Sequence, residues 1–437
     1  MKKVLLLSCY ELGHQPFPVA MAARFLKQAG FSPDITDLAV ESFPEEKVCE
    51  SDLIAISVPM HTALRIGVGA AERIRKLNPA AHINFFGLYA ELNSDYLRKN
   101  HADSTIGGEF ETPLVALATS MEKGSHLSLT RQVYPVPFRE TLLPLEKYAH
   151  FDNGVEHLPA GYVEATRGCK HLCTHCPIPP VYGGKFFGIP EEIVLADIRQ
   201  QVEAGARHIT FGDPDFLNGP THSRKIVHAL HDEWPDLTFD ATIKVEHLLK
   251  HRELLPELKE TGCAFITSAV ESMSNTVLRN LDKGHSKEEI FAALETVQKA
   301  GITFRPTWVA FTPWTTKEDY REMLHFLKEE ELIENVDPVQ LALRLLVPPG
   351  SLLLKNDQMI PHLGKLDQEG FSYNWKHPDS KMDHLYQDVS RMVSEDTRQS
   401  VDPAVTCSRV WKTLEGTEIR FDPKRKKPPR LTESWYC

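Results

Sequence analysis

Residues 161–176 read GYVEATRGCKHLCTHC and contain three of the eight cysteines of the chain, Cys169, Cys173 and Cys176. The short apolar run Gly161–Ala165 predicts a buried β-strand. Gly168 then allows the backbone to turn. We therefore expect the three cysteines, spaced C-x3-C-x2-C, in the loop at the carboxyl end of this strand.

The same alternation of strand and helix continues from residue 160 to about residue 350. One helix begins after Pro190, and another begins at a capping box formed by Ser286 and Glu289. Six β-α units predict a parallel (β/α)6 partial TIM barrel, with chemistry at the carboxyl ends of its strands. The expected strands are Gly161–Ala165, His208–Phe211, Thr238–Ile243, Ala264–Ala269, Thr303–Ala310 and Val339–Leu346.

The first 130 residues predict a separate doubly wound, Rossmann-like parallel sheet. Its helices are expected at Pro18–Ala29 and Thr62–Leu77, and ligands are expected at its β-α loops. Residues 131–159 are rich in proline and predict a linker along the surface, and residues 351–437 form a C-terminal region. The expected strands are Val4–Leu7, Asp34–Thr36, Leu53–Val58, Ile83–Gly87 and Ser104–Ile106.

The bulk properties limit the class of protein. Hydrophobic residues make up 42% of the 437-residue chain and charged residues 25%, which favours a globular protein. The net charge of -11 argues against nucleic acid as a partner. No apolar run is long enough to cross a membrane, and the start MKKVLLLSCYELGHQ lacks the apolar core of a secretory signal. These features predict a cytoplasmic protein, in which clustered cysteines indicate metal binding rather than disulfides.

Three thiolates suit a four-iron cluster in which one iron keeps an open coordination position. An open position is typical of a catalytic metal. The alternative is a zinc site, for which His171 or His175 could supply a fourth ligand.

The cysteine loop resembles that of the radical S-adenosylmethionine (SAM) superfamily, although His175 stands where an aromatic residue often precedes the third cysteine. The resemblance implies a [4Fe-4S] cluster whose open iron binds SAM. It also implies that Gly212 and Asp213 meet the SAM amino group, that Glu271 meets the ribose, and that Arg344 lies near SAM. Gly107-Gly108-Glu109 looks like the family's Gly-Gly-Glu motif, but it precedes the cysteines and is assigned to the first sheet.

A doubly wound domain before such a barrel resembles the cobalamin-binding class of that superfamily. The cobalamin fingerprint Asp-x-His-x-x-Gly is absent, so the resemblance implies cobalamin without a protein ligand to cobalt. The alternative is a domain that only docks a partner. The contacts would come from Tyr10, His14, Met60, His61, Thr62, Gly87 and Gly108.

The chain ends LTESWYC. This end resembles a subfamily whose tail reads Cys-Cys-Ala-Glu-Pro or Cys-selenocysteine-Ala-Glu-Pro, here stopping after Cys437. We expect Cys437 to act as a catalytic nucleophile or soft ligand in such a tail, the alternative being an idle thiol.

Together these features predict an enzyme that makes a 5′-deoxyadenosyl radical. The resemblance implies methylation, or related radical chemistry, at an unactivated position of a small molecule or peptide, with an electron donor such as flavodoxin or ferredoxin. One rival is a tRNA-modifying radical SAM methylthiotransferase, which would want a basic module and more cluster cysteines. The other is a non-catalytic cobalamin or iron–sulfur sensor.

Overall fold

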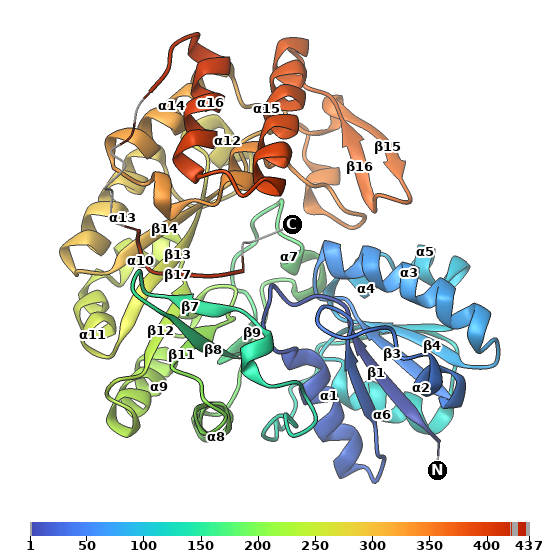
Figure 1. The fold of residues 1–437 in the computed structure, drawn as a ribbon. Helices are drawn as coiled ribbons and strands as arrows, with labels where there is room; N and C mark the ends of the chain where they lie inside the picture. Colours follow the sequence, from blue (N-terminus) through green and yellow to red (C-terminus); the bar gives the residue numbers. More distant parts are fainter. Residues whose placement is uncertain (1, 420, 422–426, 434–437) are drawn as a thin grey trace.

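The structure is a computed structural model that describes residues 2–419, 421 and 427–433. Figure 1 shows two α/β units side by side, the N-terminal one in blue and cyan and the second running from green to orange. This arrangement confirms the predicted α/β class with two parallel sheets.

The first sheet has six parallel strands in the order β2-β1-β3-β4-β5-β6. Its strands are β1 (Val4–Ser8), β2 (Asp34–Asp37), β3 (Leu53–Ser57), β4 (His82–Phe86), β5 (Ser104–Gly108) and β6 (Gly124–Ser128). Its helices are α1 (Phe17–Gln28), α2 (Glu45–Glu50), α3 (His61–Leu77), α4 (Leu88–Leu92), α5 (Ser94–Asn100) and α6 (Glu111–Ser120).

Alternation along β1 explains why helices cover both faces of this sheet. Leu5 and Leu7 join the apolar core under α3 and α4, whereas Val4 and Leu6 join the core under α1 and α6. The predicted strands and helices of this unit are confirmed. Strand β6 was not predicted, because its residues GSHLS are mostly exposed and carry little apolar signal.

The second sheet is curled and runs in the order β14-β13-β12-β11-β8-β7-β17. Five strands are parallel: β8 (His157–Val163), β11 (His208–Phe211), β12 (Thr238–Thr242), β13 (Cys263–Glu271) and β14 (Thr303–Trp308). The helices between and after them are α8 (Glu191–Glu203), α9 (Pro220–Glu233), α10 (Val245–Lys250), α11 (Leu255–Glu260), α12 (Asn275–Asn280), α13 (Lys287–Lys299) and α14 (Lys317–Glu329). The capping box of Ser286 and Glu289 is present at α13, as predicted.

The predicted sixth barrel strand, Val339–Leu346, is wrong as a strand. Residues Pro338–Ala342 form a 3-10 helix, and only a single parallel bridge joins Phe311 to Arg344. The side-chain oxygen of Gln340 accepts a hydrogen bond from the Trp308 backbone N at 3.0 Å. A side chain therefore takes the place that a strand carbonyl would have had beside the end of β14.

Residues 131–159 do more than cross the surface. Tyr134, Phe138, Leu145 and Phe151 are buried, and β7 (His150–Asp152) adds an antiparallel strand to β8. Farther along, β17 (Arg430–Leu431) pairs antiparallel with β7, so the two ends of the second unit meet in one sheet.

In the described part of the C-terminal region, a hairpin and two helices lie at the top of Figure 1. The hairpin joins β15 (Leu363–Asp367) to β16 (Ser372–Trp375), and the helices are α15 (Ser380–Arg398) and α16 (Pro403–Glu415). Both helices pack apolar side chains onto the barrel core, among them Val389 and Val410. Within the described part of the chain, no helix has the length and apolarity that a membrane crossing requires.

Candidate cluster and cofactor site

The three cysteines lie in a loop closed at its base by a short ribbon. Strand β9 (Thr166–Gly168) pairs antiparallel with β10 (Phe186–Gly188), and helix α7 (Ile178–Tyr182) lies within the loop. Gly168 has φ +75°, and a Cβ there would lie 2.4 Å from the Lys185 carbonyl oxygen. Only glycine fits this turn, which begins the cysteine loop.

The arrangement of ligand atoms speaks against one zinc ion in this loop. A tetrahedral zinc site brings thiolates within about 4 Å of one another. Among the described residues, one group of three side chains brings its possible metal-ligand atoms within 4.8 Å of one another. That group is His171, Asp215 and His247, and it contains no cysteine. His171 lies 3.3 Å from Asp215 and His175 lies 3.2 Å from Glu271, so both histidines contact carboxylates. Separate thiolates fit a four-iron cluster, because each thiolate binds a different iron.

Lys283 supplies a buried positive charge beside the cysteine loop. Burial alone would lower its pKa, but Glu271 together with Cys173 and Cys176 outweighs burial and raises the pKa. Its Nζ donates to Glu271 at 3.1 Å. An ammonium group here fits the negative charge that thiolates bring to an iron–sulfur cluster.

Glu271 stands at the end of β13 in a constrained conformation. Its φ is +66°, in the left-handed region that costs a non-glycine residue about 1–3 kcal/mol. Burial opposes ionisation of its carboxyl group, but Lys283 and His175 outweigh burial and hold the pKa at about 2. The backbone thus turns a charged carboxylate toward the cysteine loop, as expected of a ligand-contacting residue; its contact with SAM stays a prediction.

Asp213 positions the backbone that leads into the loop. Its carboxylate accepts hydrogen bonds from Ala165 N at 3.0 Å and from Thr166 Oγ1 at 2.5 Å. Burial raises its pKa to about 6. At Gly212, a Cβ would lie 1.9 Å from the Tyr162 hydroxyl, so the absence of a side chain lets Tyr162 pack there. The described contacts of these two residues are structural, and their predicted contact with the SAM amino group remains untested.

Arg344 turns toward the C-terminal region. Its Nη1 lies 2.9 Å from an Asp383 carboxylate oxygen, and its guanidinium stands 3.6 Å from the Trp375 ring centroid. These contacts hold the hairpin and α15 to the barrel, and the predicted position of Arg344 near SAM remains a prediction.

The first sheet presents its topological switch point between β1 and β3, where the strand order reverses. Tyr10 follows β1, Met60 follows β3, and Gly87 follows β4, so all three belong to one edge of the sheet. Like His61 and Thr62, they are half-buried. A crevice at the carboxyl ends of strands beside a switch point is where open α/β sheets bind ligands.

His14 and Gly108 differ from these half-buried residues in that both are buried. The His14 ring packs 4.9 Å from the Tyr162 ring, and burial lowers its pKa to about 4. Gly108 has φ +68°, and a Cβ there would lie 2.1 Å from the Ser128 carbonyl oxygen. The pairing of β5 with β6 accounts for this glycine, and no ligand is needed to explain it.

The cysteine loop touches the first sheet directly. Val181 and Tyr182 of α7 belong to the same apolar cluster as residues of α3 and α4, and Figure 1 shows α7 beside α4. The Tyr182 hydroxyl donates to Glu109 at 3.2 Å. Gly107 and Gly108 end strand β5 of the first sheet, as predicted, and the next residue, Glu109, contacts the loop that carries the cysteines.

Sequence reasoning missed a buried ionic group at this junction. Arg167, just before Cys169, lies 2.5 Å from Glu111 and 2.9 Å from Glu164. Burial, only partly offset by Arg167, raises the pKa of Glu164 to about 7. The sequence contained no signal for this group, because its members come from separate elements and form no spaced motif.

Cys437 lies outside the described residues. The described chain before it reaches the first sheet, where Glu433 accepts a hydrogen bond from the Tyr10 hydroxyl at 3.1 Å.

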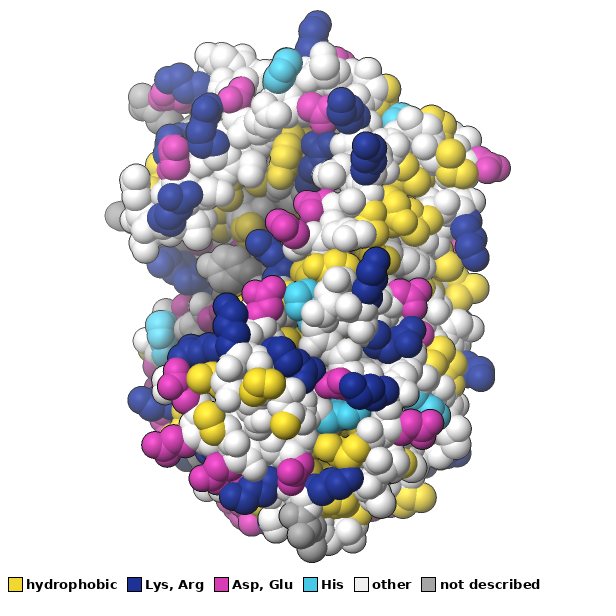
Figure 2. Space-filling view, turned by 90° about the vertical axis from the view of Figure 1, so that its right-hand side faces the viewer, with side chains coloured by type: hydrophobic (Ala, Val, Ile, Leu, Met, Phe, Trp, Pro, Cys, Tyr) yellow, Lys and Arg dark blue, Asp and Glu magenta, His cyan; other side chains and the backbone are white. Residues whose placement is uncertain are grey.

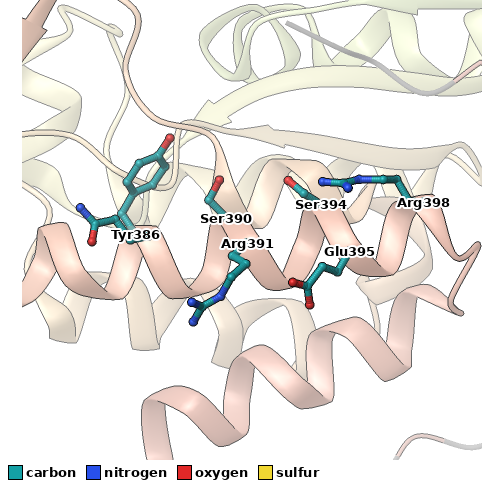
Figure 3. A pocket seen from close by; sticks show the side chains of 7 residues that line it. Tyr386, Ser390, Arg391, Ser394, Glu395 and Arg398 are labelled. Atoms are coloured by element: carbon teal, nitrogen blue, oxygen red, sulfur yellow. The ribbon is translucent and has the colours of Figure 1, made fainter.

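Two surface features lie away from this site. A hollow of about 400 Å³ lies along α15, where Tyr386, Ser390 and Arg398 line it (Figure 3). Figure 2 shows basic and acidic side chains interspersed over the face turned toward the viewer. That face therefore offers no broad basic surface of the kind that nucleic acids need.

Comparison with known proteins defines the class of this site. Residues 163–328 match the family model of the radical SAM superfamily, so the chain contains a radical SAM domain. This family implies a [4Fe-4S] cluster and SAM as cofactors. The matched segment contains the cysteine loop and strands β11 to β14.

Particular relatives are distant. The chain is 22% identical to the ribosomal protein uS12 methylthiotransferase RimO of Natranaerobius thermophilus over 52% of this chain and 51% of that protein. It is 23% identical to an uncharacterized methyltransferase of Pyrococcus horikoshii over 53% of each chain. The chain spans about half the length of these curated relatives.

Two solved structures share the fold over more of the chain. The cobalamin-dependent SAM radical enzyme OxsB, solved with aqua-cobalamin, matches with a TM-score of 0.72 at 15% identity, covering 91% of this chain and 67% of that one. The radical SAM methyltransferase TsrM from Kitasatospora setae matches with a TM-score of 0.62 at 15% identity, covering 75% of this chain and 71% of that one. The likeness to OxsB, which covers 91% of this chain, extends the shared fold to the first sheet.

Proposed function

We propose that this chain is a cobalamin-dependent radical SAM enzyme that methylates, or otherwise transforms by radical chemistry, an unactivated position of a small molecule or peptide. One observation supports this most strongly: the loop with three cysteines lies against the switch-point edge of a doubly wound sheet. Two cofactors bound at these places would lie next to each other.

The residues present fit both groups. Cys169, Cys173 and Cys176 would hold three irons, and the cluster would supply the electron that cleaves SAM to a 5′-deoxyadenosyl radical. Half-buried residues of three loops, Tyr10, Met60 and Gly87 among them, would form the floor for cobalamin, which supplies a transferable methyl group when bound.

The protein's own contribution would be to position these groups and to exclude water. Asp213 fixes the strand end before the cysteines, and the ion pair of Lys283 with Glu271 fixes the wall beside them. The contacts of α7 with the first sheet close one side of the site. A water-excluded pocket protects a carbon radical from side reactions.

Methylthio transfer, suggested by the name of the RimO relatives, is the rival activity. A second cluster would need further grouped thiols. In the described part of the chain, the remaining cysteines stand on four separate elements or strand ends: Cys9, Cys49, Cys263 and Cys407. This separation favours methylation or related chemistry.

The radical activity can be tested on anaerobically reconstituted protein treated with dithionite and SAM. We expect 5′-deoxyadenosine, which a sensor would not form. An intact cluster without this product contradicts the proposal.

Cobalamin binding has its own test. The chain is incubated with hydroxocobalamin and passed through gel filtration, and we expect about one cobalamin per chain to stay bound. Met60→Arg, at the switch-point edge, should abolish retention, whereas Ile66→Arg, on the exposed side of α3, should not. If both variants retain the same amount of cobalamin, cobalamin does not bind at the switch-point edge.

A further inference from the structure

Three side chains from separate parts of the barrel unit meet at the cysteine loop. His171 comes from the loop itself, Asp215 follows β11, and His247 lies in α10 after β12. Their donor atoms all lie within 4.8 Å of one another. The Asp215 Oδ2 is 2.6 Å from His247 Nδ1 and 3.3 Å from His171 Nε2.

The atoms that face the centre of this group lack regular hydrogen bonds. His171 Nε2, Asp215 Oδ2 and His247 Nδ1 are all buried without a hydrogen bond of normal geometry. Asp215 is fully buried, and His247 is nearly so. Unsatisfied buried polar atoms are rare in native proteins and call for an explanation, such as a missing ion.

The atoms that face outward from two of the same side chains have partners. His171 Nδ1 lies 3.6 Å from Glu246 Oε2, and Asp215 Oδ1 accepts from the Lys244 backbone N at 3.4 Å. A histidine that binds metal commonly gives its other ring nitrogen to a carboxylate, which fixes the ring. The inner atoms of the group thus face one another without a hydrogen bond of normal geometry, and two of the side chains have supporting contacts on their outer side. This is the pattern of a metal site.

We propose that His171, Asp215 and His247 bind one divalent transition metal ion of the zinc class, separate from the iron–sulfur cluster. Two imidazoles and one carboxylate suit zinc and its neighbours, whereas oxygen-only sites suit magnesium or calcium. Three protein ligands leave a further position for water or substrate.

A metal ion at this site would also connect the cysteine loop to the barrel. His171 lies between Cys169 and Cys173, while Asp215 and His247 belong to the barrel. An ion bound there ties the cysteine loop to the carboxyl ends of β11 and β12. The site uses no cysteine, so it can be filled together with a [4Fe-4S] cluster.

The test uses the full chain, reconstituted with iron and sulfide, incubated with Zn²⁺ and freed of excess metal. Elemental analysis is expected to find one zinc per chain in addition to the cluster iron. Replacement of Zn²⁺ by Co²⁺ is expected to give the visible absorption of cobalt bound to nitrogen and oxygen ligands. Both readouts are independent of enzymatic activity.

Variants make the assignment specific. His247→Gln should weaken zinc binding, measured by competition with a chromophoric chelator, by more than about 100-fold, and Glu246→Gln should weaken it by about 10–100-fold. The matched control is His251→Gln, because His251 also follows β12 and its ring lies 5.5 Å from the His247 ring. This control should bind zinc as the unchanged chain does.

Two results would overturn the proposal. The first is a cluster-loaded chain that retains no zinc, which would make the three side chains a purely hydrogen-bonded group. The second is zinc binding that His247→Gln and Asp215→Asn leave unchanged. If Asp215→Asn fails to fold, the cluster absorbance will reveal it, and His247→Gln still decides the question.

Discussion

Lys283 and Glu271 form a buried ion pair beside the cluster cysteines, and Lys283→Met removes its positive half. The side chains are only 4% and 8% exposed. The pKa of Glu271 lies at about 2 instead of 4.5, and at about 1.36 kcal/mol per pKa unit this difference corresponds to about 3 kcal/mol. Breaking a buried pair leaves an uncompensated charge, which costs about 3–5 kcal/mol. We therefore expect Lys283→Met to lower the free energy of unfolding by about 3–5 kcal/mol at pH 7.

Urea unfolding of the cluster-free chain, followed by tryptophan fluorescence, measures this change. The matched control is Lys299→Met, which breaks the exposed pair with Glu295 and should cost less than about 1 kcal/mol. Adding Glu271→Gln to Lys283→Met should restore about 1 kcal/mol or more, because it removes the stranded charge.

The pH dependence gives the sign of the effect. Glu271 has a lowered pKa in the folded chain, so its stabilising contribution is present above pH 4.5 and is lost as the pH falls toward 2. In Lys283→Met the unpaired Glu271 carboxyl can become neutral by protonation. The difference in free energy of unfolding between this variant and the unchanged chain should therefore narrow as the pH falls from 7 to 4.5. The reasoning is refuted if Lys283→Met costs no more than Lys299→Met, or if the gap widens on acidification.

Three further changes test other parts of the site. Cys173→Ala should abolish 5′-deoxyadenosine formation, measured by mass spectrometry of the products. The control Cys49→Ala, at an exposed cysteine outside the C-x3-C-x2-C motif, should leave the product yield unchanged. Gly168→Ala should destabilise the cysteine loop by about 1–3 kcal/mol and lower the iron retained per chain, in contrast to Gly69→Ala, which meets open space. Burial lowers the pKa of His14 to about 4 from 6.5, so its contribution to stability is present above pH 6.5 and is lost as the pH falls to 4. His14→Phe should flatten the stability curve in that window, and an unchanged slope in urea titrations would exclude this role.

The sequence predicted the parts of the fold that carry periodic apolar patterns. The two parallel sheets, the helices α1 and α3 and the position of the cysteine loop all follow from such patterns. Strand β6 was missed because it is exposed. The sixth barrel strand was predicted wrongly because the side chain of Gln340, which no pattern identifies, fills the place beside Trp308.

The site was predictable only where residues lie close together in the sequence. The three cysteines form a motif, whereas Arg167 meets Glu111 across 56 positions of the chain. His171, Asp215 and His247 likewise come together only through the barrel. The cysteine motif leaves His171 open as a fourth ligand of a zinc site with the cysteines; the structure instead turns its ring toward the Asp215 carboxylate.

The open iron position can be tested by EPR and Mössbauer spectroscopy of the oxygen-free, reconstituted chain, recorded with and without SAM. We expect a four-iron cluster with one iron distinct from the other three, and a spectrum that changes when SAM binds to that iron. A cluster whose irons all have protein ligands, a spectrum that SAM leaves unchanged, or a single metal ion held by Cys169, Cys173 and Cys176 would contradict the assignment.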